Sequence, residues 1–348
     1  MHDPAQKSGG DVILSVEDLA VHFPVGGGLL GGGVRLLRAV DGVDLELKRG
    51  ECLSLVGESG CGKSTVALSI LGLLAPTRGR IVLDGHVVTG RQSGDRKALA
   101  RIVQMVFQDP YASLNPRQTV RRTLEDPLRL HGVTAKSEID ERVAVMLRHV
   151  GLRPEQAGRY PHEFSGGQRQ RIGIARALIL NPKIVICDEP VSALDVSIRA
   201  QIINLLLDLK ETLGLSYIMI SHDLGVVEHM SDRVAVMYLG RIVETGGWRD
   251  IFERPAHPYT QTLIAAIPDP LRRAPLATAK GELPNPLNPP EGCAFSPRCR
   301  HAEAVCRRAP VPPLETRPDG HSVRCWRADE IASQTALASA ESEHSKEA

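Results

Sequence analysis

Residues 57 to 65 read Gly-Glu-Ser-Gly-Cys-Gly-Lys-Ser-Thr. This stretch matches the pattern G-x-x-x-x-G-K-[ST], whose glycines leave backbone N–H groups free to surround a polyphosphate. In this pattern Lys63 reaches the β and γ oxygens and Ser64 binds Mg²⁺. Chance would place the pattern in a chain of this length about once in a hundred sequences. The predicted nucleotide-binding residues are therefore Gly57, Glu58, Ser59, Gly60, Cys61, Gly62, Lys63, Ser64 and Thr65.

Length and composition narrow the class of protein. With 348 residues and 42% hydrophobic content the chain can bury a full core, and its length predicts one large domain plus a smaller one. No apolar stretch approaches a membrane span, and residues 1–10 lack the apolar core of a signal peptide, so we expect the chain to stay in the cytoplasm. The formal net charge of +1 does not favour nucleic acid as a partner.

Short apolar runs alternate with helical patterns, which is typical of an α/β fold with a parallel sheet. Residues 51–56 form an apolar run that leads into the phosphate loop, and helix formers follow from residue 64 to residue 74. Two more apolar runs, at residues 183–187 and 216–220, have the character of buried parallel strands. The segment between them carries a helical stripe that Gly214 closes, made of Ile198, Ile202, Leu205, Leu206, Leu209 and Leu213.

Other segments set the organisation of the chain. Residues 12–23 alternate as a strand does, and the glycine triplets at 26–28 and 31–33 predict a loop insertion. Residues 119–150 hold two helical patterns, the second with Ile139, Val143, Leu147 and Val150 on one face. After about residue 255 the chain becomes proline-rich, with 14 of the 24 prolines between residues 251 and 330, which predicts a separate, irregular region. Residues 331–348 are expected to be a disordered tail.

Polar residues follow the predicted strands at the edge where parallel sheets collect ligands. Asp188 and Glu189 follow the strand at 183–187, and His222 follows the strand at 216–220. We expect Asp188 to hold Mg²⁺ together with Ser64, and Glu189 to polarise the attacking water. Gln108 is placed to sense the γ-phosphate or the metal.

A second glycine pair, in Ser165-Gly166-Gly167-Gln168, precedes a helix predicted from about residue 168 to residue 180. A serine and bare backbone amides at a helix start can receive an anion. The alternative is a simple helix cap.

The order of these motifs resembles the ATP-binding cassette family from about residue 11 to residue 250, and Ser192-Ala193-Leu194-Asp195 adds a further match. The resemblance implies a P-loop NTPase core with a mixed sheet (residues 11–255) and a helical subdomain at about 109–180. It also implies a head-to-tail dimer, in which residues 165–168 of one subunit close over ATP held by the other. On this resemblance Glu189 is the general base, His222 contacts the γ-phosphate and Asp195 communicates across the dimer. Phe23 either stacks on adenine or is a core aromatic.

Three further stretches resemble the ATPases of oligopeptide and dipeptide importers, namely residues 27–31, 107–116 and 257–260. The partners implied are two transmembrane permease subunits, a second ATPase (a copy or a paralogue) and an extracytoplasmic substrate-binding protein. The implied location is the cytoplasmic face of the membrane, with residues 109–118 docking on a permease subunit. Nickel or glutathione import, and a non-transport ATPase that acts as a mechanical clamp, remain alternatives.

Seven cysteines raise separate questions. Cys293, Cys299, Cys306 and Cys325 lie in the proline-rich region at residues 256–330, with His301 and His321 nearby. Four thiolates suit an iron–sulfur cluster or zinc, and free or bridged thiols are the third possibility. The importer resemblance implies a 4Fe–4S cluster. Cys187 has the character of a core residue. We expect the Cys61 thiol, near Lys63 and a helix start, to be acidified, so that its alkylation blocks ATP binding.

Overall fold

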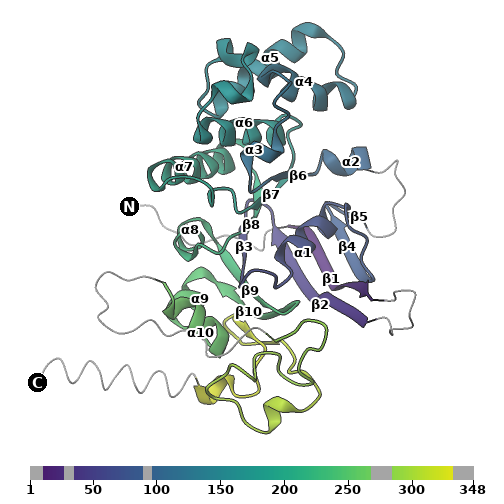
Figure 1. The fold of residues 1–348 in the computed structure, drawn as a ribbon, viewed down its shortest axis with the longest axis vertical. Helices are drawn as coiled ribbons and strands as arrows, with labels where there is room; N and C mark the ends of the chain where they lie inside the picture. Colours follow the sequence, from purple (N-terminus) through teal and green to yellow (C-terminus); the bar gives the residue numbers. More distant parts are fainter. Residues whose placement is uncertain (1–10, 27–34, 89–95, 268–283, 332–348) are drawn as a thin grey trace, which may run out of the picture.

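The computed structural model describes residues 11–26, 35–88, 96–267 and 284–331 (Figure 1). The predicted loop insertion, apart from Gly26, and the importer-like stretch at 27–31 lie outside these residues. The predicted tail also lies outside them, apart from Ile331.

The larger sheet is mixed, as predicted. Among the described residues it has eight strands in the order β11-β12-β10-β9-β3-β8-β7-β6. The neighbours from β6 to β9 pair in parallel, while β10, β12 and β11 add on in antiparallel fashion. The strands are β3 (Cys52–Val56), β6 (Val103–Val106), β7 (Ile184–Asp188), β8 (Ser216–Ile220), β9 (Arg233–Tyr238), β10 (Arg241–Gly247), β11 (Glu315–Thr316) and β12 (Ser322–Val323). Every residue of β3 and β8 is buried, which explains their continuous apolar runs.

A smaller antiparallel sheet packs beside the larger one, on the right in Figure 1. Its strands are β1 (Val12–Val25), β2 (Arg35–Lys48), β4 (Arg78–Leu83) and β5 (His86–Val87), in the order β2-β1-β4-β5. One apolar cluster joins the two sheets and α1, with Leu14, Val40, Leu53, Ile70 and Ile218 among its members. The strand predicted at 12–23 is β1, whereas β2 was missed.

Helices cover the sheets and form a projection at the top of Figure 1. They are α1 (Lys63–Ile70), α2 (Arg96–Ala100), α3 (Pro110–Ser113), α4 (Val120–Leu130), α5 (Lys136–His149), α6 (Gly166–Leu178), α7 (Val196–Leu213), α8 (Leu224–Met230), α9 (Trp248–Glu253) and α10 (Pro258–Ala265). Short 3₁₀ turns are η2 (Pro154–Gly158), η3 (Pro161–Glu163) and η4 (Val305–Arg307). Among the described residues, no helix combines the length and the apolar character needed to cross a membrane.

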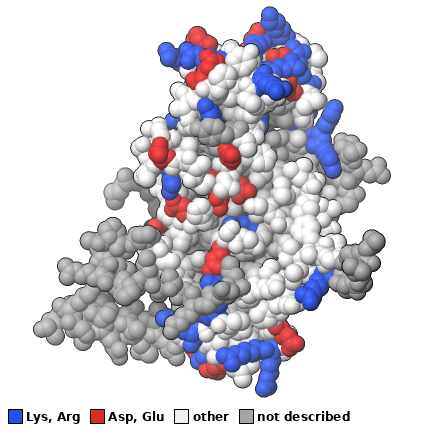
Figure 2. All heavy atoms as spheres, in the orientation of Figure 1, with Lys and Arg blue, Asp and Glu red and all other residues white. Residues whose placement is uncertain are grey.

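The projection is built around α6, which packs against α3, α4, α5 and α7. The face predicted for α5 is buried, since Ile139, Val143, Leu147 and Val150 all lie in the core. The outer surfaces of α4 and α5 carry ion pairs such as Arg122 with Asp126. Blue and red side chains are accordingly interspersed at the top of Figure 2.

The C-terminal region is irregular, as predicted, but it is joined to the larger sheet. β12 extends the sheet by pairing with β10, so that Val323 lies opposite Glu244. The ring of Phe295 packs edge-on against Tyr238 of β9, with centroids 5.4 Å apart, and it also contacts Tyr259 of α10. These contacts bring the cysteine-containing segment close to the phosphate loop.

Candidate active site

The phosphate loop connects β3 to α1, and two of its glycines are required by close packing. A Cβ on Gly57 would lie 2.2 Å from the carbonyl oxygen of Met237. A Cβ on Gly62 would lie 2.3 Å from that of Ala39. Both residues also have positive φ angles, 151° and 110°. Because only glycine fits these positions, the loop keeps the shape that turns its N–H groups toward a ligand.

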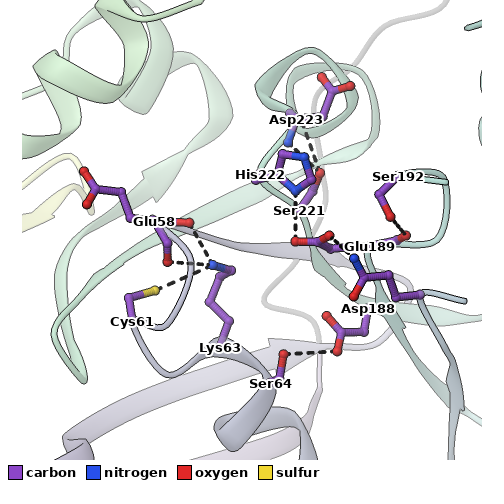
Figure 3. A network of polar contacts seen from close by, with 12 residues as sticks. Glu58, Cys61, Lys63, Ser64, Asp188, Glu189, Ser192, Ser221, His222 and Asp223 are labelled. Atoms are coloured by element: carbon purple, nitrogen blue, oxygen red, sulfur yellow. Dashed lines mark hydrogen bonds and ion pairs between the residues drawn. The ribbon is translucent and has the colours of Figure 1, made fainter. Parts of the chain in front are cut away.

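Lys63 lies at the first position of α1 and folds back over the loop (Figure 3). Its Nζ donates to the carbonyl oxygens of Gly57 at 2.7 Å and Glu58 at 3.0 Å. The side chain is only 7% exposed. The ammonium is therefore held at the loop, where a bound polyphosphate would exchange these carbonyl contacts for phosphate oxygens.

Asp188 and Ser64 lie side by side, as the sequence predicts for a Mg²⁺ site. Ser64 Oγ donates to Asp188 Oδ2 at 3.1 Å across the gap between α1 and the end of β7. Burial raises the pKa of the Asp188 carboxyl, and the hydrogen bond from Ser64 opposes this effect. A cation beside Asp188 would favour the ionised carboxylate, because opposite charge offsets the cost of burial.

The Glu189 carboxylate is held between His222 and Gln108, which follow the ends of β8 and β6. Its Oε1 lies 2.9 Å from His222 Nδ1, and its Oε2 accepts from Gln108 Nε2 at 2.7 Å. The backbone of Glu189 has φ 47°, a conformation that costs a non-glycine residue of order 1 kcal/mol. The Glu189 N–H donates to the Ile220 carbonyl at 2.8 Å, which holds this turn in place. The carboxylate is thus oriented by contacts on both oxygens.

These groups line one pocket of about 630 Å³. The sequence-predicted residues that it brings together are Phe23, Ser59, Gly60, Gly62, Lys63, Ser64, Thr65, Gln108, Asp188, Glu189 and His222. Leu37 and Ala39 of β2 complete the wall and were not predicted, because β2 itself was missed. Phe23 lines the pocket and also packs on the apolar cluster, so its position is compatible with both readings made from the sequence.

The Ser165-Gly166-Gly167-Gln168 segment starts α6 and does not line this pocket. Ser165 and Gln168 form a reciprocal capping box, in which Ser165 Oγ accepts from Gln168 N at 3.4 Å and Gln168 Oε1 accepts from Ser165 N at 3.1 Å. A Cβ on Gly167 would lie 2.5 Å from Ile198 Cγ2, so the starts of α6 and α7 touch here. Asp195, the residue before α7, is exposed.

The expectation that the Cys61 thiol is acidified was wrong. The residue is only 4% exposed, and burial raises the pKa of its thiol even though Lys63 acts in the opposite direction. Lys63 Nζ lies 3.7 Å from Cys61 Sγ, and this contact is buried. Desolvation of the thiolate therefore outweighs the nearby positive charge. Cys187 is fully buried in β7, as expected of a core residue.

The four C-terminal cysteines line one small apolar pocket together with His257, His301 and Phe295. Burial raises the pKa of Cys293 to about 11 and that of Cys325 to about 12. The described part of the chain contains no disulfide at these cysteines and no group of three His, Cys, Asp or Glu side chains that could hold a metal ion. The four cysteines therefore surround one small pocket, but the described residues do not gather three donors for a single ion.

Two contacts to the phosphate loop were not predicted. Tyr259 and Arg298 both bind Glu58, although they lie 201 and 240 residues further along the chain. Tyr259 belongs to the importer-like stretch at 257–260, whereas the sequence offers no comparable signal for Arg298.

A phosphate loop facing the hydrogen-bonded pair Ser64 and Asp188 and an oriented Glu189 carboxylate is the arrangement expected at the nucleotide site of a P-loop ATPase. Comparisons with known proteins agree. Residues 40–192 match the family described as ABC transporter, and residues 243–306 match the oligopeptide/dipeptide transporter C-terminal region. The chain belongs to the ABC transporter family of ATPases, and it carries the C-terminal region of the oligopeptide and dipeptide transporters.

Two relatives and one solved structure illustrate the similarity. The chain is 48% identical over 320 residues to the oligopeptide transport ATP-binding protein AppF of Bacillus subtilis, covering 90% of this chain and 97% of AppF. It is 54% identical over 268 residues to the glutathione import ATP-binding protein GsiA of Salmonella paratyphi A, covering 76% of this chain and 43% of GsiA. The dimeric ATP-binding cassette MJ0796 bound to ADP and phosphate has a TM-score of 0.60 and 29% identity, covering 68% of this chain and 99% of that chain.

Proposed function

We propose that this chain is the ATP-hydrolysing subunit of an ABC importer, and that ATP hydrolysis energises uptake of oligopeptides or dipeptides. The observation that carries the proposal is the Glu189 carboxylate, which Gln108 and His222 hold on the wall of the pocket that the phosphate loop lines. The match of residues 243–306 to the C-terminal region of oligopeptide/dipeptide transporters, and the similarity to AppF, support peptides as cargo.

The residues predicted from the sequence receive the following roles in phosphoryl transfer to water. Residues 57–65 bind the phosphates and Phe23 stacks on the adenine. Glu189 is the general base that accepts the proton of the attacking water, and His222 contacts the γ-phosphate. Ser64, Asp188 and Gln108 would hold Mg²⁺, which would supply positive charge to the β and γ oxygens. The hydrogen bond between Ser64 and Asp188 supports this grouping because the two oxygens already lie 3.1 Å apart.

Residues 165–168 serve the ATP bound by a second ATPase subunit. Ser165 is exposed, caps α6 and lies outside the chain's own nucleotide pocket, which supports a role toward a partner. Asp195 is exposed close to the same surface, since Gly167 touches Ile198 one turn further along α7. Two such subunits in head-to-tail contact would complete each other's sites, and Asp195 would carry signals across the dimer.

The chain divides into an ATP-binding domain at residues 11–255, a C-terminal region at 256–330 and a tail at 331–348. Within the first, the helical subdomain at about 109–180 presents residues 109–118 to a permease subunit. Arg176 of α6 supports this role, since its guanidinium donates to the Ser113 carbonyl and lies 5.8 Å from the centroid of the Phe107 ring. Movement of residues 109–118 would therefore displace α6, the helix that Ser165 caps.

Purification from membranes tests the importer proposal. The tagged chain is expected to co-purify with two transmembrane permease subunits and a second ATPase, because ATP-driven closure must act on a membrane channel at its cytoplasmic face. An extracytoplasmic binding protein belongs to the same system, and no nucleic acid is expected. The complex in vesicles should take up labelled di- or oligopeptide in an ATP-dependent manner. Recovery without any membrane subunit would contradict the proposal and favour a soluble ATPase.

Glutathione is the second candidate cargo, because the chain is 54% identical to GsiA over 268 residues. Glutathione is itself a short peptide derivative, so the ATPase alone does not distinguish it from other peptides. In the vesicle assay, competition by unlabelled glutathione against labelled dipeptide separates the two cargoes. Complete competition at low glutathione would assign the complex to glutathione.

We also propose that Cys293, Cys299, Cys306 and Cys325 hold a 4Fe–4S cluster. Four thiols sharing one apolar pocket support it, and a cluster separates its thiolate ligands more widely than a single zinc ion does. The chain purified without oxygen is expected to contain about four iron atoms and as many inorganic sulfides. Cys306→Ser should lower both, whereas Cys187→Ser, a change in a buried strand, should not. One zinc and no iron per chain would contradict the proposal.

A further inference from the structure

Glu58, the second residue of the phosphate loop, is held by two residues of the C-terminal region. Its backbone N–H donates to the hydroxyl oxygen of Tyr259 at 2.8 Å. Its carboxylate is bound by both terminal nitrogens of Arg298, Nη1 to Oε2 at 2.9 Å and Nη2 to Oε1 at 3.1 Å. The Glu58 carbonyl meanwhile accepts from Lys63 Nζ at 3.0 Å. Backbone and side chain of this loop residue are therefore fixed from opposite directions.

The contact from Arg298 has the geometry of a fixed support. A parallel, two-bond contact between guanidinium and carboxylate is both strong and directional. The Arg298 side chain is only 9% exposed, and its guanidinium carbon lies 6.0 Å from the Tyr238 ring centroid and 5.9 Å from that of Phe295. Aromatic faces on this cation limit its freedom. Arg298 is also the neighbour of Cys299, so the support is part of the cysteine-containing segment.

Tyr259 is fixed just as firmly. It is fully buried, and its own N–H donates to His257 Nδ1 at 3.0 Å. The N–H of His257 in turn donates to the buried carboxylate of Glu244 at 2.9 Å. His321 Nε2 lies 2.7 Å from the other oxygen of Glu244. This buried network connects β10 and the C-terminal region to the hydroxyl that holds the loop.

We propose that Arg298 and Tyr259 are positioning residues for ATP, through which the C-terminal region sets the nucleotide affinity of the phosphate loop. The inference rests on the proposed ATPase function and deepens it by naming a control on the same site. Both residues act through Glu58. Tyr259 fixes the backbone of Glu58, so that the amides of the following loop residues stay oriented toward the bound phosphates. Arg298 holds the Glu58 carboxylate.

Charge gives the contact of Arg298 a second effect. The Glu58 carboxylate belongs to a loop that binds a polyanion, and an unpaired negative charge there would oppose ATP. Arg298 compensates this charge with two hydrogen bonds and turns the carboxylate toward the C-terminal region. Loss of Arg298 therefore both loosens the phosphate loop and leaves the Glu58 carboxylate free to repel the phosphates of ATP.

Arg298→Ala in the full-length chain is the first test. The dissociation constant for a fluorescent ATP analogue with Mg²⁺, and the KM for ATP of the membrane complex, are expected to rise about tenfold, or about 1.4 kcal/mol. The kcat at saturating ATP should fall less than twofold, because the groups around Glu189 are untouched. Arg298→Lys keeps the charge but not the paired geometry, so an intermediate KM is expected. Arg300→Ala, an exposed arginine of the same segment, is the matched control and should change neither value.

A double variant tests whether Arg298 acts through Glu58. Because Glu58→Gln removes the charge that Arg298 compensates, the double variant Glu58→Gln, Arg298→Ala is expected to bind ATP at least as well as Arg298→Ala alone. An additive loss would overturn this route. Tyr259→Phe, which removes only the hydroxyl, should raise the KM for ATP about threefold. This variant replaces Arg298→Ala as the test if Arg298→Ala strongly lowers the thermal unfolding temperature.

The outcomes separate this proposal from the one it rests on. A wild-type chain that neither binds nor hydrolyses ATP contradicts the ATPase function itself. A wild-type chain that hydrolyses ATP, with KM unchanged in Arg298→Ala and Tyr259→Phe, overturns the positioning role alone. A fall in kcat at constant KM overturns it as well, because a support of the binding loop must act on affinity.

Discussion

Glu189→Gln is expected to lower the kcat for ATP hydrolysis by about 10²–10³-fold while leaving the affinity for MgATP within about twofold. The amide has the size of the carboxylate but cannot accept the proton of the attacking water. Glu189 is the member of the pocket whose two oxygens are both oriented, by His222 at 2.9 Å and by Gln108 at 2.7 Å. Affinity is preserved because the phosphate contacts belong to the loop and to Lys63. Single-turnover hydrolysis and nucleotide binding measure the two effects separately.

In the proposed dimer hydrolysis would reopen the paired sites, so the same variant should accumulate as an ATP-bound dimer. Size-exclusion chromatography with and without ATP detects this state. Glu228→Gln is the matched control, since Glu228 is an exposed glutamate on the nearby α8 and lies outside the pocket. A Glu189→Gln chain that keeps more than half of the wild-type rate would remove Glu189 from the role of general base.

Sequence reasoning predicted the parts of the fold that depend on local pattern. Buried parallel strands must be apolar throughout, so β7 and β8 were recognisable as short runs, and the stripe that ends at Gly214 identified α7. β2 was missed even though its second half alternates as a strand does, with Val43, Leu45 and Leu47 buried between exposed residues. The pairing of β12 with β10 could not be predicted from the sequence. A two-residue strand has no periodicity from which to infer a partner.

Some residues of the candidate site were also predictable from local pattern, and others were not. Asp188, Glu189 and His222 were predictable because the ends of neighbouring parallel strands meet at one edge, so positions in sequence imply proximity. The state of Cys61 was not predictable, since the sequence shows a nearby lysine but not the burial that outweighs it. Arg298 was likewise hidden, because its contact with Glu58 depends on how an irregular segment folds back over 240 residues.

On the proposed function, the two glycine-containing motifs are halves of different sites. Ser59, Gly60 and residues 62–65 of the first motif line the pocket with Asp188 and Glu189, whereas residues 165–168 start a helix that the pocket does not include. A chain on its own should bind ATP but hydrolyse it poorly. Substitutions in the two motifs should accordingly differ in kind, since one removes binding and the other removes turnover.

Ser165→Arg is expected to leave ATP binding by the isolated chain within about twofold and to lower ATP hydrolysis by the assembled complex about 100-fold. The arginine places bulk and charge at the helix start that is proposed to close over a partner's ATP, and it removes the hydroxyl that accepts from Gln168 N. Loss of this cap alone costs about 1 kcal/mol, so the folded chain should persist. Ser137→Arg, the same change at an exposed position of α5, is the matched control.

Mixing variants tests whether the two halves meet across a dimer. For an assembly with two copies of this chain, equal amounts of the Ser165→Arg and Lys63→Ala variants are mixed. Lys63→Ala lacks the lysine of its own phosphate loop. Half of the dimers then contain both variants, and each of these has one site in which an intact loop faces an intact Ser165. The mixture should recover about a quarter of the wild-type hydrolysis, although each variant alone is inactive. Recovery is impossible if both motifs serve the same ATP within one chain, because every chain would then carry a broken site.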